Sequence, residues 1–444
     1  MKPLMLITGP VATRSGYGSH ARDLVRSLVS MDKFDIHINS LKWGNCPMNA
    51  LNIKDPNDKI ITDRIMRSNE LTRQPDVHIQ ISVPNEFTPL AKYNIGVTAG
   101  IETTAPKPEW VDGLNKMNMN IVPSTFTKKV FDDVNYEKID EQTKQKVGEL
   151  KSTQPMEVLF EGVDTNIFKK TSEFSKDFVD EINKISEKFV FLYAGHWLQG
   201  KLGQDRKDTG MLVKTFLETF KNKAKQPALL METSGATFSV IDRNEILNKI
   251  DDIKDTVSGK LPNIYVLHGD LTDDEMNQMY NHPKVKAHVS FTHGEGFGRP
   301  LLEASLSEKP IIASDWSGHK DFLNTKLSVL LPGALVDVPK SGLSKDYRVD
   351  GSKWFTINYQ YASKIMLDIF KHHRKYALNS KKLAIGNRVK YSLNSMTKKF
   401  DGILKKYLPE FEDAPQQIDL KLPKLKKVGD AAPKKIKLPK LKKV

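Results

Sequence analysis

One stretch late in the chain constrains the fold most, because a strand, a glycine-rich turn and a helix follow one another directly in it. Apolar residues alternate over 285–291, as expected for a strand. Gly294, Gly296 and Gly298 then allow a tight backbone path, and Pro300 suits the start of a helix. The helix N-terminus that follows such a turn is a natural seat for a phosphate group.

Two glutamates belong to this unit, one in the turn and one in the helix. Glu295 and Glu303 are close enough that both carboxylates can face one bound ligand. Their spacing resembles the E-x7-E signature of family 4 glycosyltransferases, and residues 310–323 resemble the usual continuation. The resemblance implies that Glu303 holds the ribose hydroxyls of a nucleotide sugar and that Glu295 approaches the donor sugar.

The same resemblance places the donor against the turn. It implies donor-binding positions at Gly294, Gly296, Phe297 and Gly298. Arg299 departs from the apolar residue that the family usually has there, which leaves the donor preference open. The alternative is an ordinary strand–turn–helix whose glutamates cap the helix and face solvent.

The chain begins with a similar unit. A short apolar strand ends at Gly9, and after a loop Ser19 is predicted to cap a helix. This is the start of a doubly wound sheet, without the G-x-G-x-x-G fingerprint of NAD-binding proteins. In the resembling family the first loop approaches the donor diphosphate, which implies that role for Gly16 and Gly18. Alternatively, these two glycines serve only the geometry of the turn.

A second strand–loop–helix unit begins in mid-chain at residues 189–195, and it is the strongest sign of a second nucleotide-fold domain. Its loop carries Arg206 and Lys207. The resemblance implies that this basic pair neutralises the leaving diphosphate of the donor, with Lys207 the better match. An exposed cluster of charges is the alternative.

The resemblance covers nearly all of residues 1–407 and implies the GT-B fold, an α/β class with two doubly wound Rossmann-like domains facing a cleft. We predict four parts that end with a disordered lysine-rich tail: an N-terminal Rossmann-like acceptor-side domain at 1–172, a C-terminal Rossmann-like nucleotide-sugar-binding domain at 187–353, helices crossing back at 354–411, and the tail at 412–444.

The acceptor side is less clearly marked. Glu102 is expected at a strand end facing the cleft and is the acceptor-side catalytic candidate, although a buried or capping glutamate is equally compatible. His20 and His78 are interpreted as packing or surface residues. The polar stretch at about 135–154 is predicted to form a helix and a surface loop.

The net charge of +14 is concentrated in the tail. Residues 414–444 contain ten lysines and two aspartates, a contribution of +8 that leaves +6 for the rest. The octapeptide KLPKLKKV occurs there twice, and its prolines and crowded lysines oppose a packed core. Such a tail can contact an anionic polymer or membrane surface, or serve as a solubilising or partner-docking segment.

The other compositional features point to a cytoplasmic protein. Cys46 is the single cysteine, so the chain has no internal disulfide framework, and neither a signal peptide nor a membrane-spanning run is apparent. The acidic run at 272–275 is interpreted as a helix capping box. Since D-x-D, HExxH and paired CxxC motifs are absent, we predict no metal and no cofactor, with a nucleotide-diphosphate sugar as co-substrate.

The leading prediction is therefore a metal-independent retaining glycosyltransferase. The expected acceptor is a cell-envelope glycan or glycolipid, and the lysine repeats raise modified bases in DNA as an alternative. A non-catalytic nucleic-acid- or membrane-binding protein on the same fold is a further hypothesis. A sugar-nucleotide epimerase or a phosphorylase would need different site residues.

Overall fold

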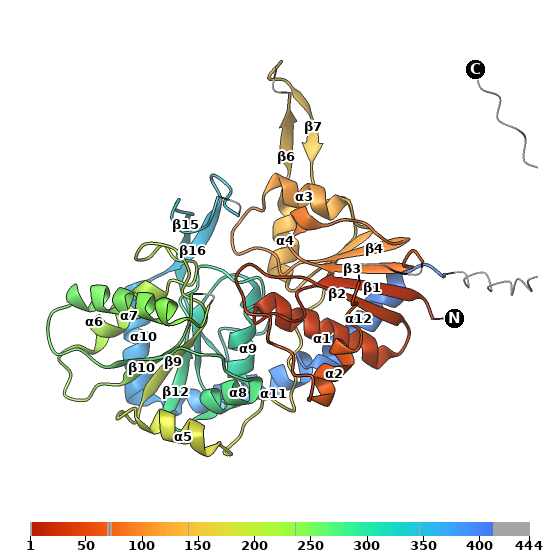
Figure 1. The fold of residues 1–444 in the computed structure, drawn as a ribbon. Coiled ribbons are helices and arrows are strands. Elements are labelled where there is room, and N and C mark those ends of the chain that lie inside the picture. Colours follow the sequence, from red (N-terminus) through yellow and green to blue (C-terminus); the bar gives the residue numbers. More distant parts are fainter. Residues whose placement is uncertain are drawn as a thin grey trace, which may run out of the picture. The chain divides into compact units, whose positions relative to one another are not determined.

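The computed structural model describes residues 2–68, 71, 73–140, 142–235, 237–345 and 347–411. Its first half is built on a parallel six-stranded sheet with the strand order β2-β1-β3-β4-β5-β8 (Figure 1). The strands of this sheet are β1 (Leu4–Gly9), β2 (Asp35–Ser40), β3 (Val77–Ile81), β4 (Tyr93–Val97), β5 (Met119–Val122) and β8 (Met156–Val158). The helical elements of this half are α1 (Gly16–Met31), α2 (Pro56–Thr62), the 3-10 turn η1 (Pro84–Glu86), α3 (Pro108–Asn115) and α4 (Thr125–Asp133).

The second half repeats this plan with a parallel six-stranded sheet of order β11-β10-β9-β12-β13-β14. Its strands are β9 (Val190–Ala194), β10 (Ala228–Glu232), β11 (Ile264–Leu267), β12 (Val285–Val289), β13 (Ile311–Ser314) and β14 (Val329–Leu331). An antiparallel pair, β15 (Gly333–Asp337) and β16 (Lys353–Ile357), follows it. The helical elements of this half are α5 (Lys176–Asn183), α6 (Thr209–Phe220), α7 (Val240–Asp255), α8 (Asp273–Asn281), α9 (Arg299–Ser305) and the 3-10 turn η2 (Gly318–Asp321).

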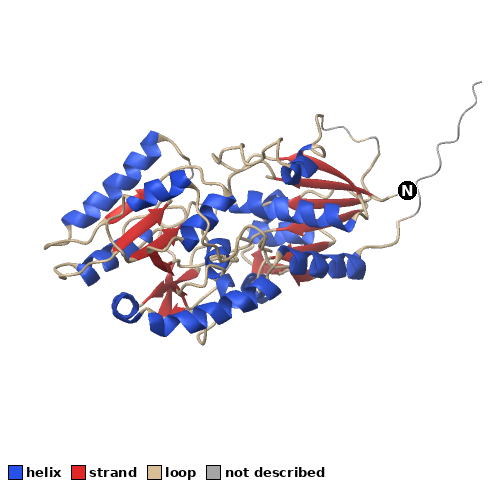
Figure 2. Ribbon diagram, turned by 90° about the horizontal axis from the view of Figure 1, so that it is seen from below, coloured by secondary structure: helices blue, strands red, loops and turns tan. Residues whose placement is uncertain are grey.

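Both sheets have helices on their two faces (Figure 2), which explains why their strands are nearly continuous apolar runs. In the second half, Phe191 on β9 packs against Phe216 and Phe220 of α6 in a fully buried aromatic cluster. Parallel strands require crossover helices, and this pattern of two doubly wound sheets confirms the predicted GT-B architecture. The predicted residue limits of the domains stay predictions.

The chain ends with three helices, of which the last returns to the first half of the chain, as predicted. They are α10 (Tyr359–His372), α11 (Arg374–Lys390) and α12 (Leu393–Tyr407), of which α12 lies beside α1 in Figure 1. The Oγ1 atom of Thr397 donates a hydrogen bond of 2.8 Å to the Oγ atom of Ser27 on α1. Lys406 Nζ lies 2.8 Å from a carboxylate oxygen of Glu157 on β8. These contacts fix α12 on the first sheet.

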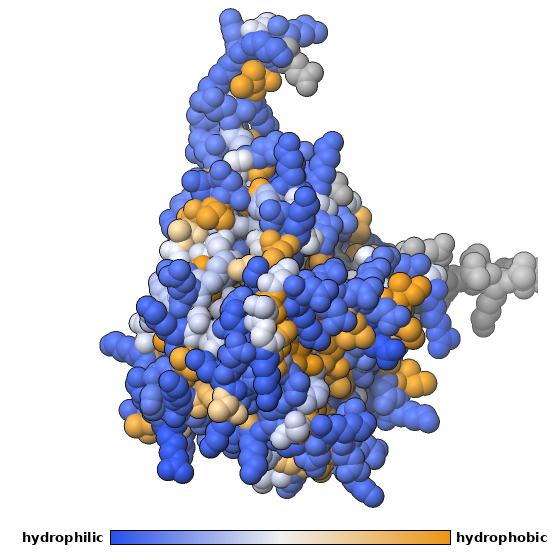
Figure 3. Space-filling model, turned by 90° about the vertical axis from the view of Figure 1, so that its left-hand side faces the viewer, coloured by the Kyte–Doolittle hydropathy of each residue, from blue (hydrophilic) through white to orange (hydrophobic). Residues whose placement is uncertain are grey.

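Two local predictions were wrong. The N-cap of α1 is Ser15, whose side chain accepts from the amide of Gly18, whereas Ser19 lies inside the helix. Within the predicted helix and loop, the strands β6 (Tyr136–Ile139) and β7 (Lys146–Leu150) pair in an antiparallel hairpin that projects from the first half. The surface of this hairpin is mostly hydrophilic in Figure 3, so no apolar period marked it as strand. The capping box of Thr272 and Glu275 is confirmed.

The predicted disordered tail with its repeats lies outside the described residues. Within the part of the chain that the structure describes, no helix is long and apolar enough to cross a membrane.

We expect Phe216→Ala to lower the free energy of unfolding by about 3–5 kcal/mol, because the fully buried ring leaves a cavity between α6 and the second sheet. Denaturant unfolding followed by circular dichroism measures this change. Val240→Ala, at an exposed position of α7, should stay within about 0.5 kcal/mol of the parent. Equal losses for both variants would contradict the assignment of this core.

Candidate functional site

The predicted site residues of the second half meet at the carboxyl ends of β9 and β12, where open α/β sheets bind ligands. Arg206 and Lys207 come from the loop between β9 and α6, and Glu295 comes from the turn between β12 and α9. Gly298 is the N-cap of α9 and has a left-handed backbone with φ of 95°. Glycine is required at that position because other residues adopt this conformation at a cost.

Four charged side chains form one cluster at this edge, in which Glu295 is buried and the other three are half-buried. Lys207 Nζ contacts Glu295 Oε1, and Arg206 Nη1 lies 3.7 Å from Glu295 Oε2. The same Arg206 Nη1 atom is 3.3 Å from Glu102 Oε1, which belongs to the segment after β4 of the first sheet. Glu102 therefore faces the second half, as the sequence predicted, and closes the cluster from the first half.

The electrostatics of the cluster favour the charged forms of Glu295 and Arg206, whereas burial disfavours those of Glu102 and Lys207. Burial pushes the pKa of Glu295 upward, but Lys207 and Arg206 together lower it to about 2. Burial raises the pKa of Glu102, and Arg206 opposes that rise. Burial lowers the pKa of Lys207, and Glu295 opposes that fall. Glu295 is therefore a carboxylate at neutral pH, and it can balance positive charge but has no proton to donate.

Glu303 lies behind this cluster on α9 and has different partners. Its Oε1 atom accepts a hydrogen bond of 2.7 Å from Arg299 Nε, and Tyr280 OH is 3.4 Å from its Oε2 atom. Burial raises the pKa of Glu303 to about 7, although Arg299 lowers it. Arg299 also contacts Asp23 on α1. The arginine that departs from the family pattern therefore joins α9 to the first half.

The glycines of the turn are explained by the other half of the molecule. A Cβ atom at Gly294 would lie 2.3 Å from the carbonyl oxygen of Glu102, and one at Gly296 would lie 2.0 Å from that of Ala99. Thr127 Oγ1 on α4 donates to the carbonyl oxygen of Gly296 over 3.3 Å. Gly294 and Gly296 thus let the segment after β4 approach the turn. From the sequence, these two glycines had been assigned only to chain geometry and ligand binding.

The remaining predicted donor positions differ in their exposure. Phe297 is buried and packs against Phe322, with ring centroids 5.1 Å apart, so its side chain has a packing role. Gly18 is held by the loop, since a Cβ atom there would lie 2.3 Å from the carbonyl oxygen of Thr13. Gly16 is exposed and has no atom within 4 Å of its Cβ direction. Of the two glycines in this loop, Gly16 has room beside it for a ligand.

Sequence reasoning missed a buried polar group directly beside the cluster. Asp208 accepts a hydrogen bond of 2.7 Å from Tyr359 OH, and its other oxygen is 3.8 Å from His293 Nε2. The His293 ring stacks on Trp354 with centroids 4.2 Å apart, and burial lowers the pKa of His293 to about 4. Asp208 directly follows Lys207, and His293 directly precedes Gly294. This proximity in the sequence to predicted site residues was the available signal.

Asp23 and Glu161 were also missed, both in the first half. Asp23 contacts Arg299 from α1, and Glu161 is a buried residue of the segment after β8. Burial raises the pKa of Glu161 to about 7, with Arg299 opposing the rise. Neither residue carries a pattern that distinguishes it from ordinary surface acids, because its role depends on the approach of the two halves.

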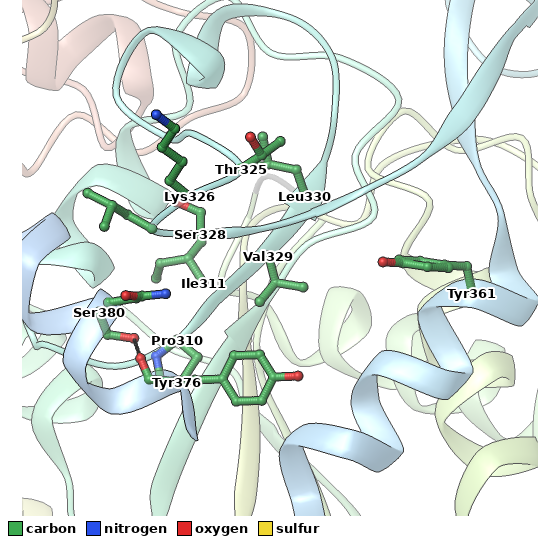
Figure 4. Close-up of a pocket in the computed structure, with 12 residues that line it drawn as sticks. Pro310, Ile311, Thr325, Lys326, Ser328, Val329, Leu330, Tyr361, Tyr376 and Ser380 are labelled. Atoms are coloured by element: carbon green, nitrogen blue, oxygen red, sulfur yellow. Dashed lines mark hydrogen bonds between the residues drawn. The ribbon is translucent and has the colours of Figure 1, made fainter. Parts of the chain in front are cut away.

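A small pocket opens beside the cluster, and a larger cavity lies elsewhere. The pocket is bounded by the ends of β9 and β12 and the start of α9, and its lining includes Lys207, Tyr280, Ser290, Glu295 and Gly298. The larger cavity lies at the amino ends of β13 and β14, between Tyr361 of α10 and Ser380 of α11 (Figure 4). We assign the function to the smaller pocket, because the charged groups converge there at the carboxyl ends of the strands.

The described residues contain no group of three or more His, Cys, Asp or Glu side chains that could hold a metal ion. The absence of a metal requirement stays a prediction.

The chain matches no protein-family model, and no curated protein matches it in sequence. It is similar in fold to three solved structures: Anabaena HepE in complex with UDP-glucose (12% identity, TM-score 0.58, 91% of this chain and 100% of that chain), a glycosyltransferase from Rickettsia africae (15%, 0.59, 92% and 100%), and the sucrose-phosphate synthase of Thermosynechococcus elongatus (11%, 0.59, 91% and 99%). At this identity the likeness establishes the GT-B fold, and membership of family 4 stays a prediction.

We expect Gly296→Ala to separate the two halves, because the added methyl group would collide with the backbone of Ala99. The radius of gyration from small-angle X-ray scattering should increase while the far-ultraviolet circular dichroism stays unchanged. Gly269→Ala is the matched control, since a Cβ atom there meets nothing within 4 Å. An unchanged radius for both variants would contradict the close approach.

Proposed function

We propose that this protein is a glycosyltransferase that moves a sugar from a nucleotide-diphosphate sugar to an acceptor, with retention of anomeric configuration and without a metal ion. The observation that carries the proposal is the convergence of Lys207, Arg206 and Glu295 at the carboxyl edge of the second sheet, with Glu303 behind them. The likeness in fold to HepE, which has been solved with UDP-glucose, supports the choice of donor class.

The donor's parts have matching groups in this site. Glu303 would accept hydrogen bonds from the ribose hydroxyls, as the resemblance to family 4 implies. Lys207 and Arg206 supply two half-buried positive charges, whose effect on a bound anion is stronger than that of charges in open water. They would stabilise the negative charge that develops on the leaving diphosphate. Gly16 leaves its loop open to approach the same phosphates.

The reaction breaks the bond between the anomeric carbon and the diphosphate oxygen and forms one from the acceptor oxygen to that carbon. Retention requires attack from the face that the diphosphate leaves, and the acceptor proton then passes to the departing phosphate oxygen. Glu295, a carboxylate with a pKa of about 2, would balance the positive charge that builds on the sugar ring. Glu102 enters from the first half and would lie on the acceptor side.

Contact between the two halves supports this reaction by excluding water. The amide of Thr125 on α4 donates to Asp321 Oδ2 over 2.8 Å, and the amide of Thr104 donates to the carbonyl oxygen of Lys353 over 2.8 Å. These bonds join the two halves of the molecule. A closed site would direct the activated sugar to the acceptor and suppress hydrolysis.

For the acceptor we propose a cell-envelope glycan or glycolipid, in line with the family that the sequence resembles. Modified DNA bases are the acceptor class that the test should set against it, because the lysine repeats can hold an anionic polymer.

We expect nucleoside diphosphate to be released from one of a panel of sugar donors in the presence of an acceptor. Glu303→Ala should lower this release at least about 100-fold, as the loss of a group that positions the donor would. Glu245→Ala, at an exposed position of α7, is the control that should leave the rate unchanged. Each protein is assayed alone, with envelope extract and with hydroxymethylated DNA. A folded wild-type protein that released nothing in any combination would refute the transferase.

Donor affinity should rise with pH up to about 7 and then level off. In the protein without bound donor, the pKa of Glu303 is about 7, so this side chain is largely protonated at pH 6. The ribose hydroxyls would donate hydrogen bonds to its ionised form. Donor binding therefore releases a proton below pH 7. Calorimetry in buffers of different ionisation enthalpy measures that proton, because the diphosphate diester of a sugar nucleotide does not titrate in this range. In Glu303→Gln both the proton release and the rise should disappear, and a wild-type affinity independent of pH would contradict this role.

A further inference from the structure

Helix α11 exposes an aliphatic stripe to solvent that the transferase reaction does not use. Leu378, Ile385 and Val389 are 64%, 56% and 71% exposed. Their spacing of seven and four residues puts them on one side of the helix, within roughly 40° of each other at 3.6 residues per turn. Leu378 lies two turns before Ile385, and Ile385 one turn before Val389, so three large aliphatic side chains share one exposed side of the helix.

The opposite side of α11 holds the helix on the body of the protein. Leu383 and Ala384 are buried there, and Asn387 Nδ2 donates a hydrogen bond of 2.9 Å to Ser305 Oγ of α9. The helix is therefore fixed in orientation, and its exposed stripe is a stable feature of the surface.

Cations flank the stripe on both sides. At the same helical spacing, Arg374, Lys381 and Arg388 line one border, and Lys375 and Lys382 line the other. Residues 374–390 contain no acidic side chain. Lys375 pairs with Asp368 of α10 over 3.2 Å, and within the described residues the other four cations form no ion pair. The stripe thus has a positively charged frame that its own surroundings leave largely uncompensated.

We propose that α11 docks the protein on an anionic membrane surface, an interaction that goes beyond the proposed transferase activity. An aliphatic row between two basic borders matches the boundary of a bilayer, where acyl chains lie beneath negative headgroups. The aliphatic side chains would enter that boundary while the cations meet the headgroups. The stripe contributes the hydrophobic part of the affinity, and the borders select anionic lipid.

Other occupants fit this surface less well. A nucleic acid would satisfy the cations but leave the aliphatic row unburied, and α11 exposes no aromatic platform on the stripe for bases to stack on. A second copy of the chain would bring the same patch onto itself, with like charges facing each other. The lysine-rich residues 414–444, with a net charge of +8, would be repelled by the same borders.

The test is co-sedimentation of the full chain with sucrose-loaded vesicles of phosphatidylcholine, with or without phosphatidylglycerol. We expect binding only to the vesicles that contain phosphatidylglycerol, and weaker binding as salt is added. The triple variant Leu378→Ser, Ile385→Ser and Val389→Ser should bind at least about tenfold more weakly, because several methylene groups no longer enter the bilayer. This variant keeps every charge of the chain, including those of residues 412–444.

Ile241→Ser on α7 is the matched control. Ile241 is 72% exposed, but α7 carries five acidic and three basic residues, so it lacks the cationic frame. The control should bind vesicles like the parent, and circular dichroism should show both variants folded. Wild-type binding that the triple variant retained would assign the affinity to charge alone and overturn the proposal. Binding to duplex DNA without binding to anionic vesicles would overturn it in favour of a nucleic-acid surface.

Discussion

The ion cluster of Arg206, Lys207, Glu295 and Glu102 is the constraint on which the rest of the site depends. These charges are partly withdrawn from water, and each has an opposite charge within about 4 Å that offsets the cost of desolvation. Three members come from the second half and one from the first, so the cluster is complete only when the two halves are in contact. The charges proposed to bind a diphosphate sugar therefore also help to hold the two halves of the molecule together.

The sequence predicted the fold well because its strongest signals are local. Strand–loop–helix units at both sheet starts and the turn at 293–298 follow from apolar period and glycine placement, and they specify parallel sheets. The pair of strands β6 and β7 escaped prediction, since most of their side chains are exposed and no alternating apolar pattern marks them. The N-cap was misplaced from Ser15 to Ser19 because both serines precede apolar helical spacing, and only backbone geometry distinguishes them.

The site was predicted less completely, for a different reason. Glu295, Glu303 and Lys207 are tied to a local pattern, so the sequence alone could name them as candidates. Asp23 and Glu161 matter because α1 and the segment after β8 approach α9, which no spacing within the sequence encodes. The same holds for Gly294 and Gly296, whose missing side chains leave room for the backbone at Ala99 and Glu102. Contacts between distant segments are visible only in the folded chain.

Arg299 belongs both to the local sequence pattern around Glu303 and to the contact between the two halves. It pairs with Glu303, the residue proposed for ribose, and with Asp23 on the other half. A ribose that binds Glu303 must share or displace the Nε hydrogen bond of Arg299, while the contact with Asp23 keeps the guanidinium near. With Arg299 held in place, the carboxylate that meets the ribose remains beside a positive charge, which favours its ionised form. The residue that departs from the family pattern would thus couple donor binding to the contact between the halves.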